Sequence, residues 1–214
     1  MNEYIDFINR IAQKLQEPLP GEVAQLKLEP FTRKAFEFDP KNLNPKLSGV
    51  LILLFPENHK TKLTLIQRPQ YDGVHSGQIA FPGGKKEDSD KSLLETALRE
   101  TFEEIGVEPE KIKIIGKLSQ LYIPPSNFLV EPFVGYTDIK PKFIADPVEV
   151  SEIIFVDLEE LLNESSFQHK EITSRNLKIK VPCYFINEKI IWGATSMILS
   201  EFLEVIKPDK PENK

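Results

Sequence analysis

The chain has 214 residues, of which 40% are apolar and 28% are charged, and its formal net charge is −6. These values are ordinary for a soluble globular protein, and the length suits one domain with a substantial core. The acidic balance argues against a nucleic-acid surface, which needs clustered Lys and Arg. It still allows a site for one small anion, because a bound metal ion can supply local positive charge.

The single cysteine, Cys183, makes an intrachain disulfide impossible and is expected to be a core residue. The first residues show no signal-peptide pattern, and no apolar run approaches the ~20 residues needed to cross a bilayer. We therefore expect a cytoplasmic protein with no nucleic-acid or membrane partner. Whether it forms a homodimer stays open.

The first elements expected along the chain are a helix and a β-hairpin. Apolar residues spaced by three and four predict an amphipathic helix over residues 2–15. Residues 18–46 are rich in proline and charge, which indicates an irregular lead-in. Two β-rich runs at 49–55 and 62–68 predict a hairpin, and a glycine-rich loop over 68–86 follows.

A second long helix is expected from about Asp90 to Ile105, with Gly106 placed to end it. Ser92 and Glu95 resemble a capping box, while Asp90 competes as the cap.

The remaining segments predict further strands, at 112–122, 129–137, 152–156 and 178–186. Short helices are expected at 158–163, with Asp157 as cap, and at 194–206. This order predicts a single α+β domain over residues 1–206, in which 1–46 are the helix and lead-in. Residues 207–214 have nothing to bury and are expected to be a disordered tail.

Three carboxylates, those of Glu100, Glu103 and Glu104, are expected on one flank of the second helix. On a wheel of ~100° per residue they span an arc of roughly 100° beside the apolar stripe. That stripe consists of Leu94, Ala97, Leu98, Thr101 and Ile105. Like charges at this spacing repel one another, and Arg99 can offset part of the repulsion by pairing with Glu95 or Glu103. A hard divalent cation, Mg²⁺ or Mn²⁺, would explain the rest; a solvated acidic face is the alternative for the bare triplet.

The loop ahead of this helix favours the metal. It contains Phe-Pro-Gly-Gly at 81–84, followed by Lys85 and Lys86, and paired glycines let a backbone approach a ligand closely. Loop and helix together resemble the signature of the Nudix hydrolase family: Gly, five residues, Glu, seven residues, then Arg-Glu-aliphatic-x-Glu-Glu-x-Gly-aliphatic. The matching residues here are Gly84, Arg99, Glu100, Glu103, Glu104, Gly106 and Val107.

The match to the signature has three departures. Asp90 stands where the first Glu is expected, the spacer to Arg99 is one residue longer, and Thr101 replaces an aliphatic residue.

Features outside this signature resemble the coenzyme A pyrophosphatase branch of the family. The upstream pattern of that branch is matched by Arg68, Gly77 and residues 81–84, although Gly73 replaces its second arginine and Pro69 occupies its small-residue position. Other matching stretches are 19–21 with Pro30 and Arg33, 132–135, 149–152 and 192–195. The resemblance covers most of residues 19–200.

The resemblance implies a Nudix-type mixed β-sheet sandwiched between helices. It also implies metal-dependent hydrolysis of coenzyme A to 3′,5′-ADP and 4′-phosphopantetheine. The ligands it implies are Glu100 and Glu104, with Glu103 as a third or on a second ion, and Arg99 orienting them. Two alternatives stay open. One is a Nudix enzyme for ADP-ribose, a dinucleoside polyphosphate or a damaged nucleotide; the other is a non-catalytic Nudix binding module, which the retained carboxylates disfavour.

Other candidate residues flank the signature. Glu149 and Glu152 are candidates for the general base, beside the signature carboxylate Glu103, with ordinary surface charge as the alternative. The substrate-binding candidates are Arg68, His75, Gly83, Gly84 and Lys85.

Overall fold

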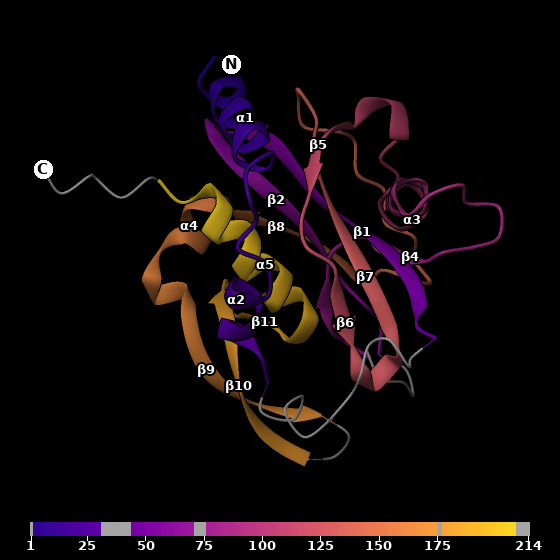
Figure 1. Ribbon diagram of the computed structural model, residues 1–214, viewed down its shortest axis with the longest axis vertical. Helices are drawn as coiled ribbons and strands as arrows, with labels where there is room; N and C mark the ends of the chain where they lie inside the picture. Colours follow the sequence, from indigo (N-terminus) through magenta and orange to yellow (C-terminus); the bar gives the residue numbers. More distant parts are fainter. Residues whose placement is uncertain (1, 31–43, 71–75, 175–176, 209–214) are drawn as a thin grey trace, which may run out of the picture.

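The computed structural model contains two β-sheets with helices packed around them (Figure 1). The residues it describes are 2–30, 44–70, 76–174 and 177–208. Helix α3 (Leu93–Ile105) covers one face of the larger sheet, whereas α1 (Asn2–Lys14) and α5 (Gly193–Ile206) lie on the opposite face. This confirms the predicted α+β architecture of a mixed sheet sandwiched between helices.

The strands of the larger sheet run in the order β3-β2-β1-β7-β5, with β4 paired to β1, β6 to β7 and β8 to β2. Strands β1 and β7 are parallel and the other pairs are antiparallel. The bounds are β1 Lys46–Glu57, β2 Lys60–Gln67, β3 Ile79–Ala80, β4 Gly83–Lys85, β5 Lys113–Lys117, β6 Leu121–Ile123, β7 Phe128–Tyr136 and β8 Glu152–Asp157.

The central strand β1 carries the core on both of its faces. Residues 51–55 are all fully buried, which explains why this segment is a continuous apolar run rather than an alternating one. Ile52 and Leu54 pack with α1 and α5, while Leu51 and Leu53 pack with α3. The predicted β1–β2 hairpin is confirmed, and Asn58 and His59 form its turn with positive φ angles, as tight hairpin turns require.

The smaller sheet was only partly predicted. Its order is β11-β10-β9, with bounds β9 Phe167–Ser174, β10 Leu177–Ile186 and β11 Lys189–Trp192. The sequence predicted β10 alone, because β9 is an edge strand with many polar residues and β11 is only four residues long. Cys183, on β10, is a buried free thiol, as expected for a core residue.

Other predicted boundaries need correction. The strand expected at 112–122 is divided into β5 and β6, and β5 itself has a register shift between Ile114 and Gly116. The lead-in is partly helical, with α2 at Gly21–Gln25. The remaining short helices are α4 Leu158–Leu162 and the 3₁₀ turns Leu26–Leu28, Pro109–Lys111, Pro124–Ser126 and Glu164–Ser166.

Three expectations concern the chain ends, a cap and membrane spans. The lead-in residues 31–43 and the end of the expected tail, 209–214, lie outside the described residues.

Asp157 precedes α4 but makes no side-chain capping bond. Its carboxylate instead pairs with Lys60 and Lys62 on β2. Within the described part of the chain, no helix is long and apolar enough to span a membrane.

A buried carboxylate on α5 connects the N-terminal segment to the larger sheet. Glu201 is fully buried, and its Oε1 accepts hydrogen bonds from the backbone N–H groups of Gly21 (3.2 Å) and Ser119 (3.1 Å). Its Oε2 accepts a third bond from Gln25 Nε2 at 2.8 Å. Buried charge is tolerated when it is fully hydrogen-bonded, so Glu201 fixes α2 and the β5–β6 connection against α5.

We expect Glu201→Ala to lower the free energy of unfolding by about 2 kcal/mol or more, because it leaves buried donors unsatisfied. Urea denaturation measures the change. Glu204→Ala on the same helix is the control, since Glu204 pairs with Lys27 and Lys207 near the surface. Its loss should stay within ~1 kcal/mol, and an equal loss in both variants would contradict the role of Glu201.

Candidate active site

Helix α3 ends at Ile105 as predicted, but it begins at Leu93, three residues after the predicted start near Asp90. The Ser92 hydroxyl accepts a hydrogen bond from the Glu95 N–H, which makes Ser92 the N-cap, and not Asp90. The Glu95 carboxylate accepts from the Lys91 N–H, one residue earlier than in a standard capping box. Gly106 ends the helix in the left-handed conformation, with φ 71°.

Glu104 on α3 is almost fully buried, with 1% of its surface exposed. Its Oε2 accepts a hydrogen bond from the Gly83 N–H at 2.8 Å. Its Oε1 has no hydrogen-bond partner; the nearest cation is Arg68 Nη2 at 3.4 Å, close enough for ion pairing only. Arg68 also donates to the Gly83 carbonyl at 3.2 Å. One carboxylate oxygen is therefore left incompletely satisfied inside the protein.

Glu100 lies one turn earlier on α3, against the backbone of β4. A Cβ added at Gly84 would overlap the Glu100 carboxylate, so glycine is needed here for that carboxylate to keep its place against the strand. Gly83 has φ +144°, and a Cβ there would overlap the Gly49 backbone on β1. The paired glycines thus bring β1, β4 and α3 together around the two carboxylates.

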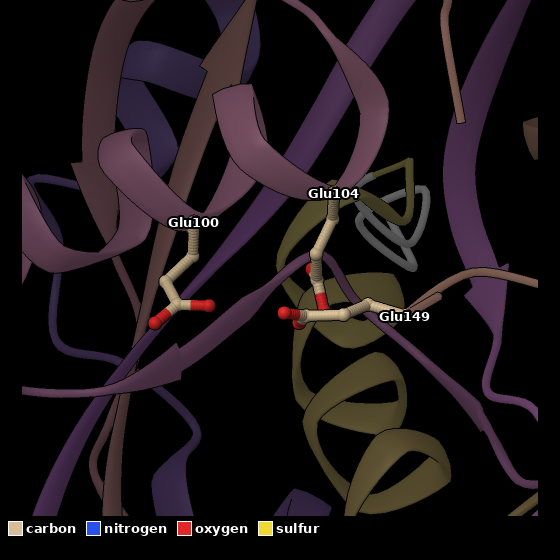
Figure 2. Close-up of side chains that lie close together, drawn as sticks. All are labelled: Glu100, Glu104 and Glu149. Carbon is tan, nitrogen blue, oxygen red and sulfur yellow. The ribbon is translucent and has the colours of Figure 1, made fainter. Parts of the chain in front are cut away.

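A third carboxylate comes from the loop before β8. One carboxylate oxygen each from Glu100, Glu104 and Glu149 lie within 4.8 Å of one another. Figure 2 shows the three side chains extending toward the same region, two from α3 and one from the loop. We call these three residues the carboxylate cluster. An all-oxygen, anionic donor set with one unsatisfied buried oxygen fits a hard divalent cation such as Mg²⁺ or Mn²⁺.

The electrostatics of the cluster agree with this fit. Burial raises the pKa of Glu104 to about 8; Arg68 and the Gly83 N–H oppose the shift, while Glu100 and Glu149 add to it. Burial also raises the pKa of Glu100, against the opposing effect of Arg99. Without a cation, burial therefore makes Glu104 and Glu100 harder to ionise than carboxylates in water.

Asp90 and Arg99 form a second network beside the cluster. The two Asp90 oxygens accept from Arg99 Nε and Nη2, each at 3.0 Å, and Asp90 also accepts from Thr96 Oγ1 and the Glu87 N–H. The hydrogen bond from Arg99 is the largest cause holding the pKa of Asp90 well below its usual range, although burial acts against it. The sequence suggested Asp90 only as a competing helix cap, and its place at the first glutamate of the signature was the available signal for this network.

Arg99 pairs with two further carboxylates of α3 through one nitrogen. Its Nη1 lies 3.0 Å from Glu100 and 2.8 Å from Glu103, so of the two partners expected for Arg99 the structure forms the pair with Glu103. Glu103 is half exposed and lies outside the carboxylate cluster, whose third member is Glu149.

The remaining predicted residues are dispersed. Glu152, at the start of β8, pairs with Lys189 at 2.5 Å and does not join the cluster. The Lys85 side chain is exposed, and its carbonyl accepts from Arg99 Nη2 at 3.3 Å. Arg68 and Gly83 contact Glu104 directly, whereas His75 lies outside the described residues.

The chain also matches the model of a known family. The family model described as NUDIX domain matches residues 45–176, which include β1, α3 and the loop that carries Glu149.

Similar proteins cover nearly the whole chain. A protein of Photorhabdus laumondii, described as an uncharacterized Nudix hydrolase NudL, is 31% identical over 204 residues, covering 94% of this chain and 97% of its own length. A protein of Pectobacterium atrosepticum with the same description is 32% identical over 154 residues, covering 72% of this chain and 79% of its own. A MutT/nudix family protein from Enterococcus faecalis has the same fold, with a TM-score of 0.51 and 20% identity over 79% of this chain and 65% of that one.

We expect Gly84→Ala to weaken Mn²⁺ binding at least ~tenfold, as loss of a supporting residue typically does, because the new methyl group displaces the Glu100 carboxylate. The fold should survive, since the end of a flexible side chain can move. Calorimetric titration with Mn²⁺ measures the affinity. In a Glu100→Ala background the same substitution should have little further effect, and a full additional loss would contradict this explanation.

We also expect the stability of the metal-free protein to depend on Glu104 and pH. The folded pKa of about 8 exceeds the reference value of 4.5, so between these values the folded state holds a proton that the unfolded state has lost. Stability should therefore fall as pH rises from 4.5 to 8 and level off above. Glu104→Gln, measured with a chelator present, should flatten this fall. An unchanged slope would show that Glu104 titrates normally.

Proposed function

Because the chain belongs to the Nudix family of hydrolases, we propose that it cleaves the pyrophosphate bond of coenzyme A or its derivatives with a divalent cation. The products are 3′,5′-ADP and 4′-phosphopantetheine. The observation that carries the hydrolase assignment is the carboxylate cluster with its unsatisfied buried oxygen on Glu104. The family's substrates are nucleoside diphosphates linked to another group, and coenzyme A is one of them.

Support for coenzyme A comes from parts of the chain outside the matched domain. The stretches at 19–21 and 192–195 resemble the coenzyme A branch. The first is bonded to α5, and the second is bonded to the strand that precedes the site loop. Gly21 donates its N–H to Glu201, and Thr195 donates its hydroxyl to the Ile79 carbonyl at 2.9 Å, on the strand that precedes 81–84. Relatives aligned over 94% of the chain extend across these segments as well.

The chain's own residues supply binding, charge and proton transfer. Glu100, Glu104 and Glu149 would hold the cation, which polarises a phosphoryl oxygen and offsets charge on the leaving oxygen when bound. Arg68, beside Glu104, is placed to contact a phosphate with its remaining N–H groups. Arg99, fixed by Asp90, holds Glu100 in place.

The reaction needs a proton acceptor for the attacking water. The oxygen of the water forms a bond to one phosphorus atom while the bond from that phosphorus to the bridging oxygen breaks. The bridging oxygen keeps the electron pair and leaves as part of the second phosphate. Of the two loop candidates, Glu149 lies in the cluster, whereas Glu152 is paired with Lys189. Glu149 is also the exposed member, and a carboxylate has oxygens enough to bind a cation and accept a proton.

We expect the protein to hydrolyse coenzyme A in the presence of Mg²⁺ or Mn²⁺ and to release 3′,5′-ADP, identified by mass spectrometry. A panel with ADP-ribose and a dinucleoside polyphosphate tests the substrate. Glu104→Gln should lower turnover by orders of magnitude while far-UV circular dichroism stays unchanged. Much faster cleavage of ADP-ribose would replace coenzyme A as the substrate, and no cleavage of any of the three would favour a binding module.

A further inference from the structure

We propose that Asp146 is the positioning residue that directs Glu149 toward the carboxylate cluster. The inference rests on the proposed function of that cluster. Glu149 comes from the connection between β7 and β8, outside any long helix or strand, yet its carboxylate lies close to those of two α3 residues. A loop residue can keep its side chain in such a position only when its backbone is fixed. The hydrogen bonds of residues 146–150 therefore determine where the Glu149 side chain lies.

The segment Asp146–Val150 is a single helical turn with its own cap. Asp146 Oδ1 accepts from the N–H groups of Val148 (2.7 Å) and Glu149 (2.9 Å), and the Asp146 carbonyl accepts from the Val150 N–H (3.0 Å). Pro147 occupies the first position after the cap, where a missing N–H costs nothing. The backbone of Glu149 is therefore bonded directly to the Asp146 side chain.

The same turn is joined to the end of α3. The Asp146 N–H donates to the Glu104 carbonyl at 2.9 Å, and the Ile144 N–H donates to the Ile105 carbonyl at 2.9 Å. These are carbonyls of the last helical turn, which have no partner within the helix. Asp146 therefore bonds to the residues of two cluster members, to Glu104 through its backbone and to Glu149 through its side chain.

This arrangement also explains why the Glu149 side chain faces the cluster. In a standard capping box, a Glu three residues after the cap bonds back to the N–H of the capping residue. Here that N–H is already bonded to Glu104. Val150 is buried in the core beneath α3, and the Ser151 N–H donates to the Gln67 carbonyl at 2.9 Å, which fixes the other end of the turn.

The test measures Mn²⁺ affinity by calorimetry without substrate, so it does not depend on which diphosphate is cleaved. We expect Asp146→Ala to weaken Mn²⁺ binding about tenfold or more, to the extent seen in Glu149→Ala. The double variant should be no weaker than Glu149→Ala alone. Asp146→Asn, which retains an oxygen acceptor, should restore most of the affinity. Asp146→Gly, a tolerated cap residue without a side-chain acceptor, replaces the alanine variant should that one fail to fold.

Asn163→Ala is the matched control. The Asn163 side chain accepts from the Ser165 N–H in a similar local turn that belongs to another part of the fold. We expect it to cost stability comparable to Asp146→Ala and leave Mn²⁺ affinity unchanged. The proposal is overturned if Asp146→Ala binds Mn²⁺ like this control, or if its loss adds fully to that of Glu149→Ala. A protein that binds Mn²⁺ in this pattern but cleaves no diphosphate would instead overturn the proposed function alone.

Discussion

The structure depends on how the carboxylate of Glu104 is buried. Removing a carboxylate from water costs several kcal/mol unless its lone pairs find donors or a cation. Gly83 satisfies one oxygen, while Arg68 stands 3.4 Å from the other without a hydrogen bond. Such partial compensation has no value for folding, since a hydrophobic residue would fill the same space at lower cost. A bound cation would complete the environment of this oxygen and would explain why Glu104 is buried. The raised pKa of Glu104 reflects the same incomplete compensation of its buried carboxylate.

Close backbone approach makes this burial geometrically possible. Gly49 on β1 lies against the Leu93 carbonyl at the start of α3, where any side chain would overlap it. A side chain at Gly83 on β4 would likewise overlap the backbone of β1, and a side chain at Gly84 would overlap the Glu100 carboxylate. Because glycine has no Cβ at these contacts, α3 lies directly on the strands, and Glu100 and Glu104 face backbone rather than solvent. The glycines therefore act by removing volume, and the conformational freedom of Gly83 is an additional requirement.

Local patterns predicted the helix well and the site only in part. Ser92 and Gly106 bound α3 through short-range hydrogen bonds, and a spacing of four residues placed Glu100 and Glu104 together, so both follow from sequence. The third carboxylate does not. Helical spacing suggested Glu103, yet Arg99 holds it at the half-exposed edge, and Glu149 takes the place through loop contacts that no periodicity encodes. The polar edge strand β9 was missed for a related reason, because its pairing with β10 is set by tertiary context.

Two departures from the family signature, the aspartate at position 90 and the longer spacer before Arg99, are accommodated by the Asp90–Arg99 pair. Aspartate is one methylene shorter than the glutamate expected there, and the spacer before Arg99 is one residue longer. Despite both changes, the carboxylate receives two parallel bonds from the guanidinium, and it is further held by Thr96 and the Glu87 N–H. In this chain the signature position therefore supplies a buried acceptor that fixes Arg99, although the side chain is shorter and the spacer longer. Arg99, fixed in this way, remains beside Glu100 and Glu103, so the network that supports the cluster is retained although the spacing that identifies it in sequence is not.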